Sequence, residues 1–289
     1  MTRPRIGFLL PHYSERSLSH MAEVLRRLAA AGAHVDVINP ARRIVDLSEF
    51  RVEHDLYVLK KISGLAFSLA GALHVRGAAI LNPYPASVAL RDKIVAFRVL
   101  QAAGVPTPAS YAASQVGELA PLLDAGPIMV KPFQGSMGYG VRVVRSAAEL
   151  AELPGLEKPV FAQRYHPPDG RDLKLYVIGE RVFGTFKVFP ARTEAEKHGE
   201  PFTPSPEFCD IARQCGRAFG IDLYGVDIVE SGGQPYVVDM SSMPGFKGIP
   251  DAPSLLAPYF YAAAERAARG EQLYNAPAGV RVAHPAAVS

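Results

Sequence analysis

The first 80 residues alternate short apolar runs with helical patterns, and this alternation restricts how that part of the chain can fold. The apolar runs lie at 5–10, 34–38, 55–60 and 78–81, and the helical patterns occupy 17–31 and 63–76. Strands separated by helices form parallel sheets through right-handed crossovers. We therefore expect a parallel α/β unit here. No G-x-G-x-x-G follows the first run, which argues against a dinucleotide-binding fold.

A boundary is expected after residue 103. The segment 87–103 has a helical pattern, with Ser87 as its predicted N-cap after the turn NPYPAS, and it ends at Gly104. The following stretch, GVPTPAS at 104–110, is rich in proline and cannot continue a helix. We place the end of a structural unit near it.

From residue 127 the pattern changes to strands joined by tight turns. The segments LKLYVIGERVFGTFKVF and YGVDIVESGGQPYVVDM each predict a hairpin, turned at 179–180 and at 231–233. Antiparallel hairpins flanked by helices indicate an α+β unit. The polar connection at 190–206 is a candidate mobile lid. The last 17 residues are expected to form a loose tail.

Composition excludes several classes of partner. The net charge is +3, from 31 basic and 28 acidic residues that are spread along the chain. This balance favours neither nucleic acid nor an anionic membrane surface as a partner. No apolar stretch reaches the roughly 20 residues that span a bilayer. Cys209 and Cys215 lie six apart in a helical pattern and fit neither a disulfide framework nor a zinc site. We expect reduced thiols in a cytoplasmic protein.

A glycine-rich loop follows the predicted strand PIMVKP. The loop contains Gly135, Ser136, Gly138 and Gly140, and the strand before it ends near Lys131. Glycines let backbone N–H groups approach an anion closely, and the serine adds a hydroxyl. The loop lacks the G-x-x-x-x-G-K-[ST] pattern of a P-loop, so a flexible hairpin turn is the alternative.

Lysines and acids recur in the predicted strands. Because side chains alternate along a strand, Lys174 shares one face with Asp172 and Tyr176, and an ordinary solvated face is the alternative. Asp227 and Asp239 lie in the two apolar runs of the second hairpin. A carboxylate in a buried strand is costly unless it is paired or binds a cation. Two such carboxylates on adjacent strands are suited to Mg²⁺. The alternative is one salt-bridged Asp and one strand-end cap.

These segments occur in the order found in the ATP-grasp superfamily. The segments are RDK at 91–93, VKPFQGSMGYGV at 130–141, FAQRY at 161–165, GRDLKLYVIG at 170–179, GVDI at 225–228 and VVDMSSMPGFKGI at 237–249. Together they resemble that superfamily over roughly residues 83–265. The chain is most similar to two branches. One is the RimK-type carboxylate–amine ligases, with a G-x-D-x-R strand and an E-V-N-x-S-P-G ending. The other is the inositol polyphosphate kinases, whose D-I-N-x-F-P-G-Y ending resembles DMSSMPGF at 239–246.

The resemblance implies a fold and a division of the chain. We expect an N-terminal parallel α/β domain (1–84) followed by a two-subdomain ATP-grasp fold, of mixed α/β and α+β class. The central subdomain would span 85–162 and the C-terminal subdomain 163–272, with a flexible tail at 273–289. The implied cofactors are ATP and one or two Mg²⁺ ions.

The resemblance also implies roles for individual residues in nucleotide and metal binding. Lys93 and Lys131 would contact the ATP phosphates, and the glycine-rich loop would cover the β- and γ-phosphates. The strand-to-turn hinge beside adenine would consist of Gln163, Arg164, Tyr165 and His166. Asp172 would meet the ribose. Asp227, Asp239 and Ser241 would hold Mg²⁺.

Further roles concern the reacting groups. Lys174 would lie near the transferred phosphate, with Lys187 as a second catalytic lysine. Lys60 and Arg192 are candidates for substrate binding, and the alternative for both is a solvated charge. Three positions depart from the usual pattern of such families: Ser241 stands where Asn is usual, Arg164 where Glu is frequent, and Asp239 where the ligases have Glu.

The shared chemistry of the superfamily is phosphoryl transfer, which depends mainly on positioning and positive charge. We expect a carboxylate–amine ligase that forms an amide or peptide bond through an acyl phosphate. The main alternative is a kinase that phosphorylates a hydroxyl of a polyol or inositol phosphate, which Asp239, the PGF ending and Lys60 favour. A non-catalytic nucleotide-binding module is a third possibility. All three imply a small-molecule ligand, no nucleic acid and no membrane.

Overall fold

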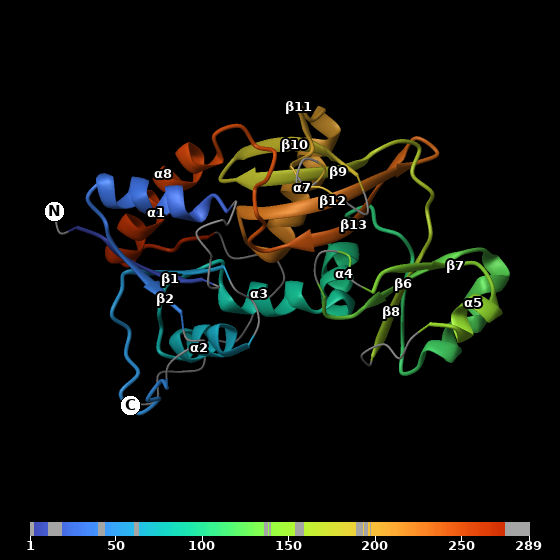
Figure 1. Ribbon diagram of the computed structural model, residues 1–289, viewed down its shortest axis with the longest axis horizontal. Coiled ribbons are helices and arrows are strands. Elements are labelled where there is room, and N and C mark those ends of the chain that lie inside the picture. The colour runs from blue at the N-terminus through green and yellow to red at the C-terminus, as the bar shows by residue number, and fades with distance from the viewer. Residues whose placement is uncertain are drawn as a thin grey trace.

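Three sheets follow one another along the chain (Figure 1). The computed structural model describes residues 3–10, 19–39, 44–60, 64–135, 138, 140–153, 159–188, 193, 196 and 198–274. In Figure 1 the N-terminal sheet lies on the left, the C-terminal sheet at the top and the small central sheet on the right. This mixed α/β architecture is the fold class expected from the sequence.

The N-terminal sheet is parallel throughout, in the order β2-β1-β3-β4. Its strands are β1 (Arg5–Leu9), β2 (His34–Ile38), β3 (Leu56–Leu59) and β4 (Ile80–Leu81), and its helices are α1 (Met21–Ala30) and α2 (Gly64–Val75). The predicted parallel α/β unit is confirmed. Helix α1 packs against α8 (Ala252–Ala268), near the end of the described chain, so the apolar core here contains residues from both ends.

The helix predicted over 87–103 is two helices, α3 (Tyr84–Arg91) and α4 (Lys93–Ala102). The prediction of one helix was wrong because Asp92 is extended and caps α4. Its Oδ1 accepts hydrogen bonds from the backbone N–H of Ile94 (2.9 Å) and Val95 (3.3 Å). Ser87 is not an N-cap, since it lies buried within α3.

The central sheet is antiparallel, in the order β5-β8-β6-β7. Its strands are β5 (Ser110–Ala113), β6 (Ile128–Pro132), β7 (Arg142–Val144) and β8 (Val160–Arg164). A 3-10 helix, η2 (Val116–Ala125), and the short helix α5 (Ala147–Ala151) close its apolar core. Strand β5, which directly follows the proline-rich link, was not predicted from the sequence.

The C-terminal sheet is also antiparallel, in the order β11-β10-β9-β12-β13. Its strands are β9 (Asp172–Ile178), β10 (Arg181–Lys187), β11 (Glu200–Phe202), β12 (Leu223–Ser231) and β13 (Gln234–Ser241). Both predicted hairpins are confirmed. Alternation along β9 places Leu173, Leu175 and Val177 in the apolar core that α7 (Pro206–Phe219) covers. On the opposite face, Asp172 and Lys174 are polar, whereas Tyr176 and Ile178 join the apolar core of the N-terminal sheet.

The predicted lid at 190–206 is only partly described. Residues 189–192, 194–195 and 197 lie outside the described residues, as does the tail from 275 onward. Glu200–Phe202 is the edge strand β11, and Ser205 caps α7, so the expected connection is shorter than the sequence suggested. Tyr274 is anchored, since its hydroxyl donates to Asn82 Oδ1 at 3.2 Å.

Two smaller expectations concern the cysteines and the membrane. Cys209 and Cys215 both lie in α7 and form no disulfide with each other. Burial raises the pKa of the Cys215 thiol to about 12. Among the described helices, none combines the length and the apolar character that crossing a bilayer requires.

Candidate functional site

One row of side chains crosses the C-terminal sheet on its polar face. In register, Thr185 on β10 opposes Lys174 on β9, Lys174 opposes Asp227 on β12, and Asp227 opposes Asp239 on β13. Residues directly opposite each other in antiparallel strands share a face and have close Cβ atoms. The two carboxylates that the sequence placed in one hairpin are thus cross-strand neighbours, with a lysine beside them.

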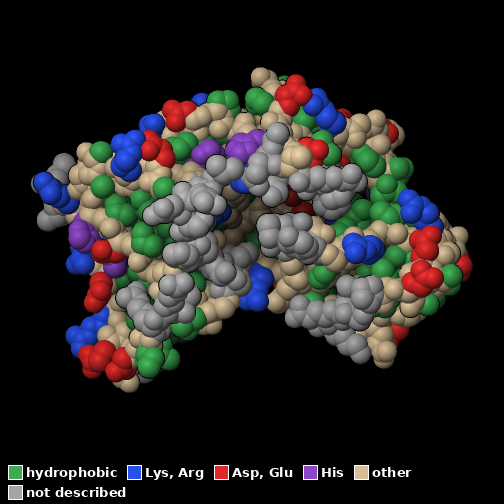
Figure 2. All heavy atoms as spheres, in the orientation of Figure 1, with side chains coloured by type: hydrophobic (Ala, Val, Ile, Leu, Met, Phe, Trp, Pro, Cys, Tyr) green, Lys and Arg blue, Asp and Glu red, His purple; other side chains and the backbone are tan. Residues whose placement is uncertain are grey.

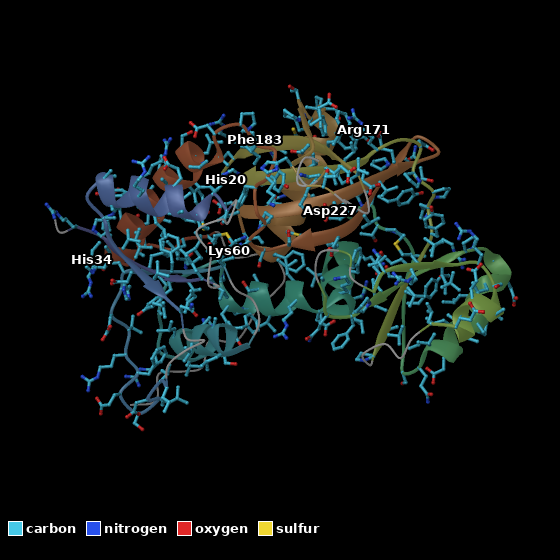
Figure 3. All side chains as sticks on the ribbon, viewed as in Figure 1. His20, His34, Lys60, Arg171, Phe183 and Asp227 are labelled. Carbon is cyan, nitrogen blue, oxygen red and sulfur yellow. The ribbon has the colours of Figure 1, made fainter. Side chains whose placement is uncertain are left out.

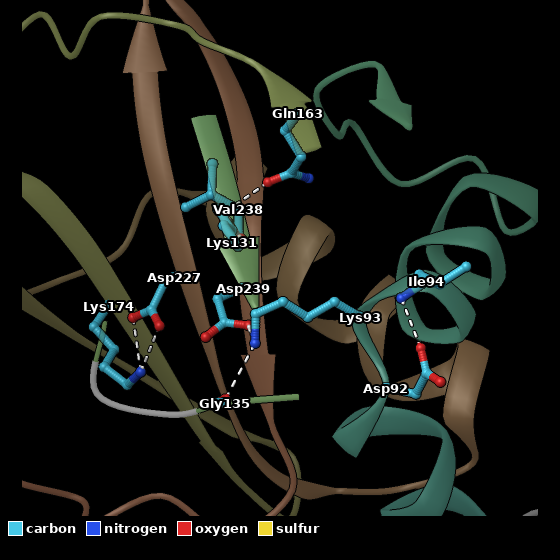
Figure 4. Close-up of polar contacts among 10 residues, drawn as sticks. All are labelled: Asp92, Lys93, Ile94, Lys131, Gly135, Gln163, Lys174, Asp227, Val238 and Asp239. Atoms are coloured by element: carbon cyan, nitrogen blue, oxygen red, sulfur yellow. Dashed lines mark hydrogen bonds and ion pairs between the residues drawn. The ribbon is translucent and has the colours of Figure 1, made fainter. Parts of the chain in front are cut away.

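Each carboxylate in this row has a cationic neighbour (Figure 4). Lys174 Nζ lies 2.7 Å and 2.9 Å from the two carboxylate oxygens of Asp227. Lys93 Nζ lies 3.7 Å from Asp239 Oδ1 and donates to the carbonyl oxygen of Gly135 at 3.1 Å. Lys93 is buried at the start of α4, where the Asp92 cap fixes the first turn. The helix break therefore positions a lysine over the metal candidates.

Lys131, on β6 of the central sheet, reaches the same region. Its Nζ donates to Gln163 Oε1 at 2.6 Å and to the carbonyl oxygen of Val238 at 2.9 Å. That carbonyl is available because β13 has a bulge: Asp227 opposes Asp239 and Ile228 opposes Val237, which leaves Val238 without a partner residue on β12. Burial lowers the pKa of Lys131 to about 8. Lys131 thus bridges the two sheets.

The oxygens at this point fit a magnesium ion. Ser241, two residues after Asp239 on the same face, has a buried hydroxyl with no hydrogen-bond partner in the described part of the chain. Opposite it stands Gly225, where a Cβ would lie 3.2 Å from Ser241 Oγ. Mg²⁺ prefers oxygen ligands, few of them from the protein. The described residues include no group of three or more His, Cys, Asp or Glu side chains that could hold a metal. Among the described side chains, the candidate donors here are two carboxylates and a hydroxyl.

The predicted hinge residues have different surroundings. Gln163 is buried, and its Nε2 donates to Ser110 Oγ at 3.2 Å. Arg164 donates from its guanidinium to the backbone oxygens of Leu122 (3.0 Å), Gly126 (2.5 Å) and Pro127 (3.2 Å). That side chain therefore stabilises the end of η2, which accounts for an arginine where a glutamate is frequent.

The last two hinge positions follow β8 directly. The backbone N–H of Tyr165 donates to the Pro127 carbonyl oxygen at 3.1 Å. The His166 ring stacks on Tyr236 of β13, with centroids 3.9 Å apart. Burial, and to a lesser degree the nearby Arg164, lowers the pKa of His166. The residues after β8 thus place a flat aromatic pair against β13.

Asp172 and Lys187 form the neighbouring row of the same face. They oppose each other in register. Burial, and then the charge of Asp227, raises the pKa of Asp172. Lys187 Nζ donates to the carbonyl oxygens of His198 (2.7 Å) and Lys247 (3.2 Å). Burial, and then the charge of Lys174, lowers the pKa of Lys187 to about 8.

Lys60 enters from the N-terminal sheet. Its Nζ donates to the carbonyl oxygens of Met243 (2.6 Å) and Pro244 (2.7 Å), just after β13. Burial lowers the pKa of Lys60 to about 8. Figure 3 shows Lys60, His20 and Asp227 gathered near the middle of the molecule. Figure 2 shows that the surface is hollowed in the same area, with Lys or Arg and His side chains around the hollow.

The structure describes three of the four predicted loop residues, Gly135, Gly138 and Gly140. Gly138 and Gly140 have φ values of 71° and 75°, which favour glycine, and the Gly135 carbonyl accepts from Lys93. Ser136 and Arg192 lie outside the described residues.

Several contributors were missed from the sequence. Tyr176 was placed on the polar face but given no role, although Lys174 Nζ lies 5.8 Å and Lys187 Nζ 5.9 Å from its ring centroid. His20 and Asn82, which contact the segment after β13, gave no signal beyond their positions at the ends of predicted elements. The contact of Lys131 with the Val238 carbonyl depends on a bulge in β13 that the sequence does not indicate.

A family model described as the RimK-like ATP-grasp domain matches residues 90–253, which is more than half of the chain. The ribosomal protein bS6–L-glutamate ligase of Salmonella paratyphi B is 28% identical over 249 residues, covering 80% of this chain and 81% of that protein. A RimK domain ATP-grasp protein from Sphaerobacter thermophilus superposes with a TM-score of 0.68 at 18% identity, covering 91% of this chain and 98% of that one.

A further similar structure is the ATP-grasp ligase PsnB, complexed with a minimal precursor, Mg and ADP. It superposes with a TM-score of 0.67 at 19% identity, covering 92% of this chain and 99% of that one. The two structural similarities cover 91% and 92% of this chain, so they reach the N-terminal sheet as well as the two later sheets. The chain therefore belongs to the RimK-like ATP-grasp family.

Proposed function

We propose that this chain is a Mg-ATP-dependent carboxylate–amine ligase that forms an amide or peptide bond through an acyl phosphate. The observation that supports it best is the convergence of Asp227 and Asp239 with Lys93 and Lys131. The acids lie on one sheet, and the lysines come from α4 and from the other sheet. Paired carboxylates with lysines from other elements beside them suit a triphosphate with its cation.

In this proposal different groups of residues bind the cation and the phosphates of Mg-ATP. Asp227, Asp239 and Ser241 would hold one or two Mg²⁺ ions, which neutralise phosphate charge when bound. Lys93 and Lys131 would exchange their present backbone and side-chain partners for phosphate oxygens. The loop of Gly135, Ser136, Gly138 and Gly140 would cover the β- and γ-phosphates with backbone N–H groups.

The nucleoside would lie against the hinge. The stacked rings of His166 and Tyr236 offer a flat surface for a purine. We propose backbone contacts from Gln163, Arg164 and Tyr165, because the Arg164 guanidinium is already committed to η2. Asp172 would bind the ribose. Its raised pKa still leaves a group that can accept or donate a hydrogen bond.

The chemistry would proceed in two displacements. A substrate carboxylate oxygen would attack the γ-phosphorus, and the bond from that phosphorus to the bridging oxygen would break to release ADP. An amine nitrogen would then attack the acyl carbon, the C–O bond to phosphate would break, and the amine would lose one proton. Lys174 and Lys187, on β9 and β10 of the C-terminal sheet, would stabilise the charge on the transferred phosphate.

The relatives favour a ligase over a kinase. By name, one is a ligase of L-glutamate and ribosomal protein bS6, and another is an ATP-grasp ligase complexed with a minimal precursor. We therefore propose a small acid or a peptide carboxylate with an amine as the substrate pair. Lys60 was one of three features that favoured the kinase, and its two hydrogen bonds to backbone oxygens weaken that argument.

An isotope experiment tests the proposal directly. Carboxylate substrates labelled with ¹⁸O, such as amino acids and short peptides, would be incubated with ATP, Mg²⁺ and a panel of amines. An acyl phosphate transfers one ¹⁸O atom to the released phosphate, so labelled phosphate is the expected result. Release of unlabelled phosphate alone indicates plain ATP hydrolysis. ADP formation with a stable phosphorylated alcohol indicates a kinase, and no nucleotide turnover indicates a binding module. Each of these outcomes contradicts the ligase.

A further inference from the structure

Two side chains of the N-terminal unit hold the backbone that follows β13, and a third lies beside it. This backbone, residues 242–246, is called the 242–246 segment. Asn82 Nδ2 donates to the Ser242 carbonyl oxygen. Lys60 Nζ donates to the Met243 and Pro244 carbonyl oxygens at 2.6 Å and 2.7 Å. The His20 ring lies beside Phe246, whose backbone counters part of the fall that burial causes in the pKa of His20. Three of the five residues are therefore held through their main chain.

The three side chains come from one edge of the N-terminal sheet. Lys60 directly follows β3, Asn82 directly follows β4, and His20 directly precedes α1. The carboxyl ends of parallel strands meet at the same edge of a sheet, where open α/β sheets generally bind ligands. Here that edge binds a piece of the chain's own backbone, beside the candidate metal site.

The 242–246 segment is tightly linked to that site. Ser241 ends β13 immediately before it, and Asp239 is two residues earlier on the same face. Pro244 lies over β12: a Cβ added at Gly225 would come within 3.1 Å of Pro244 Cγ and 3.2 Å of Ser241 Oγ. Because the packing leaves no space there, a shift of the 242–246 segment would move the Ser241 hydroxyl.

The chemistry of Lys60 points to a geometric role rather than a stabilising one. Its amine is buried enough for the pKa to fall to about 8, and none of the described residues offers it a carboxylate. Burying a cation without a counter-ion is costly, and hydrogen bonds to neutral carbonyls offset only part of that cost. An apolar residue would pack there at lower cost but could not hold two carbonyl groups in place.

We propose that Lys60 is a positioning residue: together with Asn82 it holds the 242–246 segment so that Asp239 and Ser241 are set for Mg²⁺. The inference rests on the proposed function, because it concerns the same metal site. It assigns Lys60 a role different from the substrate contact that the sequence suggested, and the two roles predict different measurements.

The test compares Lys60→Met and Lys60→Arg with wild type, and uses Arg51→Met as a control. Arg51 is an exposed residue of the same N-terminal unit, paired only with Glu49 among the described residues. ADP would be titrated by calorimetry with and without Mg²⁺. Lys60→Met should weaken Mg-dependent ADP binding about tenfold and leave metal-free binding unchanged. Lys60→Arg should recover most of the loss, and Arg51→Met should match wild type.

A second readout separates positioning from general instability. With Mn²⁺ in place of Mg²⁺, the electron paramagnetic resonance spectrum of the bound Mn-ADP complex should change in Lys60→Met and return towards wild type in Lys60→Arg. Should Lys60→Met fail to fold, Lys60→Gln and Asn82→Ser replace it. Mg-dependent affinity and spectrum equal to wild type would overturn the proposal. So would a change confined to the KM of the acceptor, since that result makes Lys60 a substrate contact.

Failure of the proposed function gives a different pattern. If the wild-type protein does not bind ADP with Mg²⁺, the nucleotide site itself is wrong. Hydrogen exchange then still tests the hold on the backbone. The amides of the 242–246 segment should exchange faster in Lys60→Met than in wild type or Arg51→Met, and equal rates would refute the hold.

Discussion

Asp227 has two relationships that depend on a single carboxylate. It forms an ion pair with Lys174 at 2.7 Å and faces Asp239 across the hairpin. Two neighbouring carboxylates repel each other unless cations lie between or beside them. Lys174 and Lys93 provide that charge in the structure, and a bound Mg²⁺ would add to it. In the proposed site, the same Asp227 carboxylate would therefore bind the metal and orient Lys174.

Replacing Asp227 should therefore abolish turnover rather than only weaken substrate binding. For Asp227→Asn we expect kcat to fall by more than about 100-fold, because a metal donor and the partner of Lys174 are lost together. ADP release measured against Mg²⁺ concentration checks this. Asp169→Asn is the matched control: Asp169 caps an exposed turn through the N–H groups of Gly232 and Gly233. Equal activities of the two variants would contradict the metal assignment.

At the residue scale the sequence identified most of the polar side chains but not their partners. Asp227 and Asp239 were selected because a carboxylate in an apolar strand is costly, and Lys93 and Lys131 because the resemblance implies phosphate contacts for them. Lys131 nevertheless bonds to the Val238 carbonyl, and Lys60 bonds to backbone oxygens as well. Backbone acceptors carry no residue type, so a sequence cannot indicate which of them a lysine will reach.

At the element scale, the break between α3 and α4 positions Lys93. Asp92 leaves the helical conformation and caps α4, and the Lys93 N–H donates to the Phe133 carbonyl oxygen at 2.9 Å. Lys93 thus stands on the first turn of a helix whose start is held both by the Asp92 cap and by the hydrogen bond to Phe133. The helical pattern of 87–103 concealed this, because apolar spacing continues across the break.

Removing the cap should affect both stability and nucleotide binding. We expect Asp92→Ala to lower the free energy of unfolding by about 1 kcal/mol, the usual cost of losing an N-cap. It should also raise the KM for ATP, because Lys93 loses its fixed position. Ser146→Ala is the control, since Ser146 caps α5, away from the cleft, through the Glu149 N–H. Urea unfolding and ATP kinetics compare them. A rise in KM of equal size in both variants would refute the link to Lys93.

The hairpins were predictable because turn residues and alternation fix them locally. The turn at Gly232–Gly233 sets the register of the hairpin as far as Ile228 opposite Val237. The bulge at Val238 then shifts the register by one residue and brings Asp227 opposite Asp239. Strand β11 was missed because three residues, Glu200–Phe202, add to an edge without an apolar pattern of their own. Their pairing with β10 is a tertiary contact that local sequence does not specify.

At the scale of the whole molecule, three buried lysines lower the stability of the folded protein while their amines are charged. Burial lowers the pKa of Lys60, Lys131 and Lys187 to about 8 from an ordinary value of 10.5. Above pH 8 the folded protein therefore binds fewer protons than the unfolded chain. The cost of burying these charges is fully present below pH 8 and is relieved as pH rises through the folded pKa.

The ligand-free protein should consequently become more stable between about pH 8 and pH 9. Above that range the Cys215 thiol acts in the opposite direction, since its pKa is raised from 9.0 to about 12. Urea unfolding at pH 7.5 and pH 9 measures the change. Lys131→Met should show a smaller rise, because one of the three contributing groups is gone. A fall in stability over this range, or an unchanged rise in the variant, would contradict the account.

The assembly of the three sheets is the least predictable feature. The division into 1–84, 85–162 and 163–272 stays a prediction from the resemblance. The packing of α1 on α8, and the hold of the N-terminal edge on the 242–246 segment, join residues that are 160 or more positions apart. Such contacts follow from the complete fold, and no local pattern in the sequence announces them.

The central claim is that Asp227 and Asp239 share a cation with a triphosphate that Lys93 and Lys131 bind. A crystal structure with a non-hydrolysable ATP analogue and Mn²⁺, measured at a wavelength where manganese scatters anomalously, tests it most directly. The account predicts an anomalous peak between the carboxylates at 227 and 239, with both lysines on phosphate oxygens. A nucleotide bound away from these four side chains, or a peak elsewhere with the acids still paired only to lysines, would contradict it.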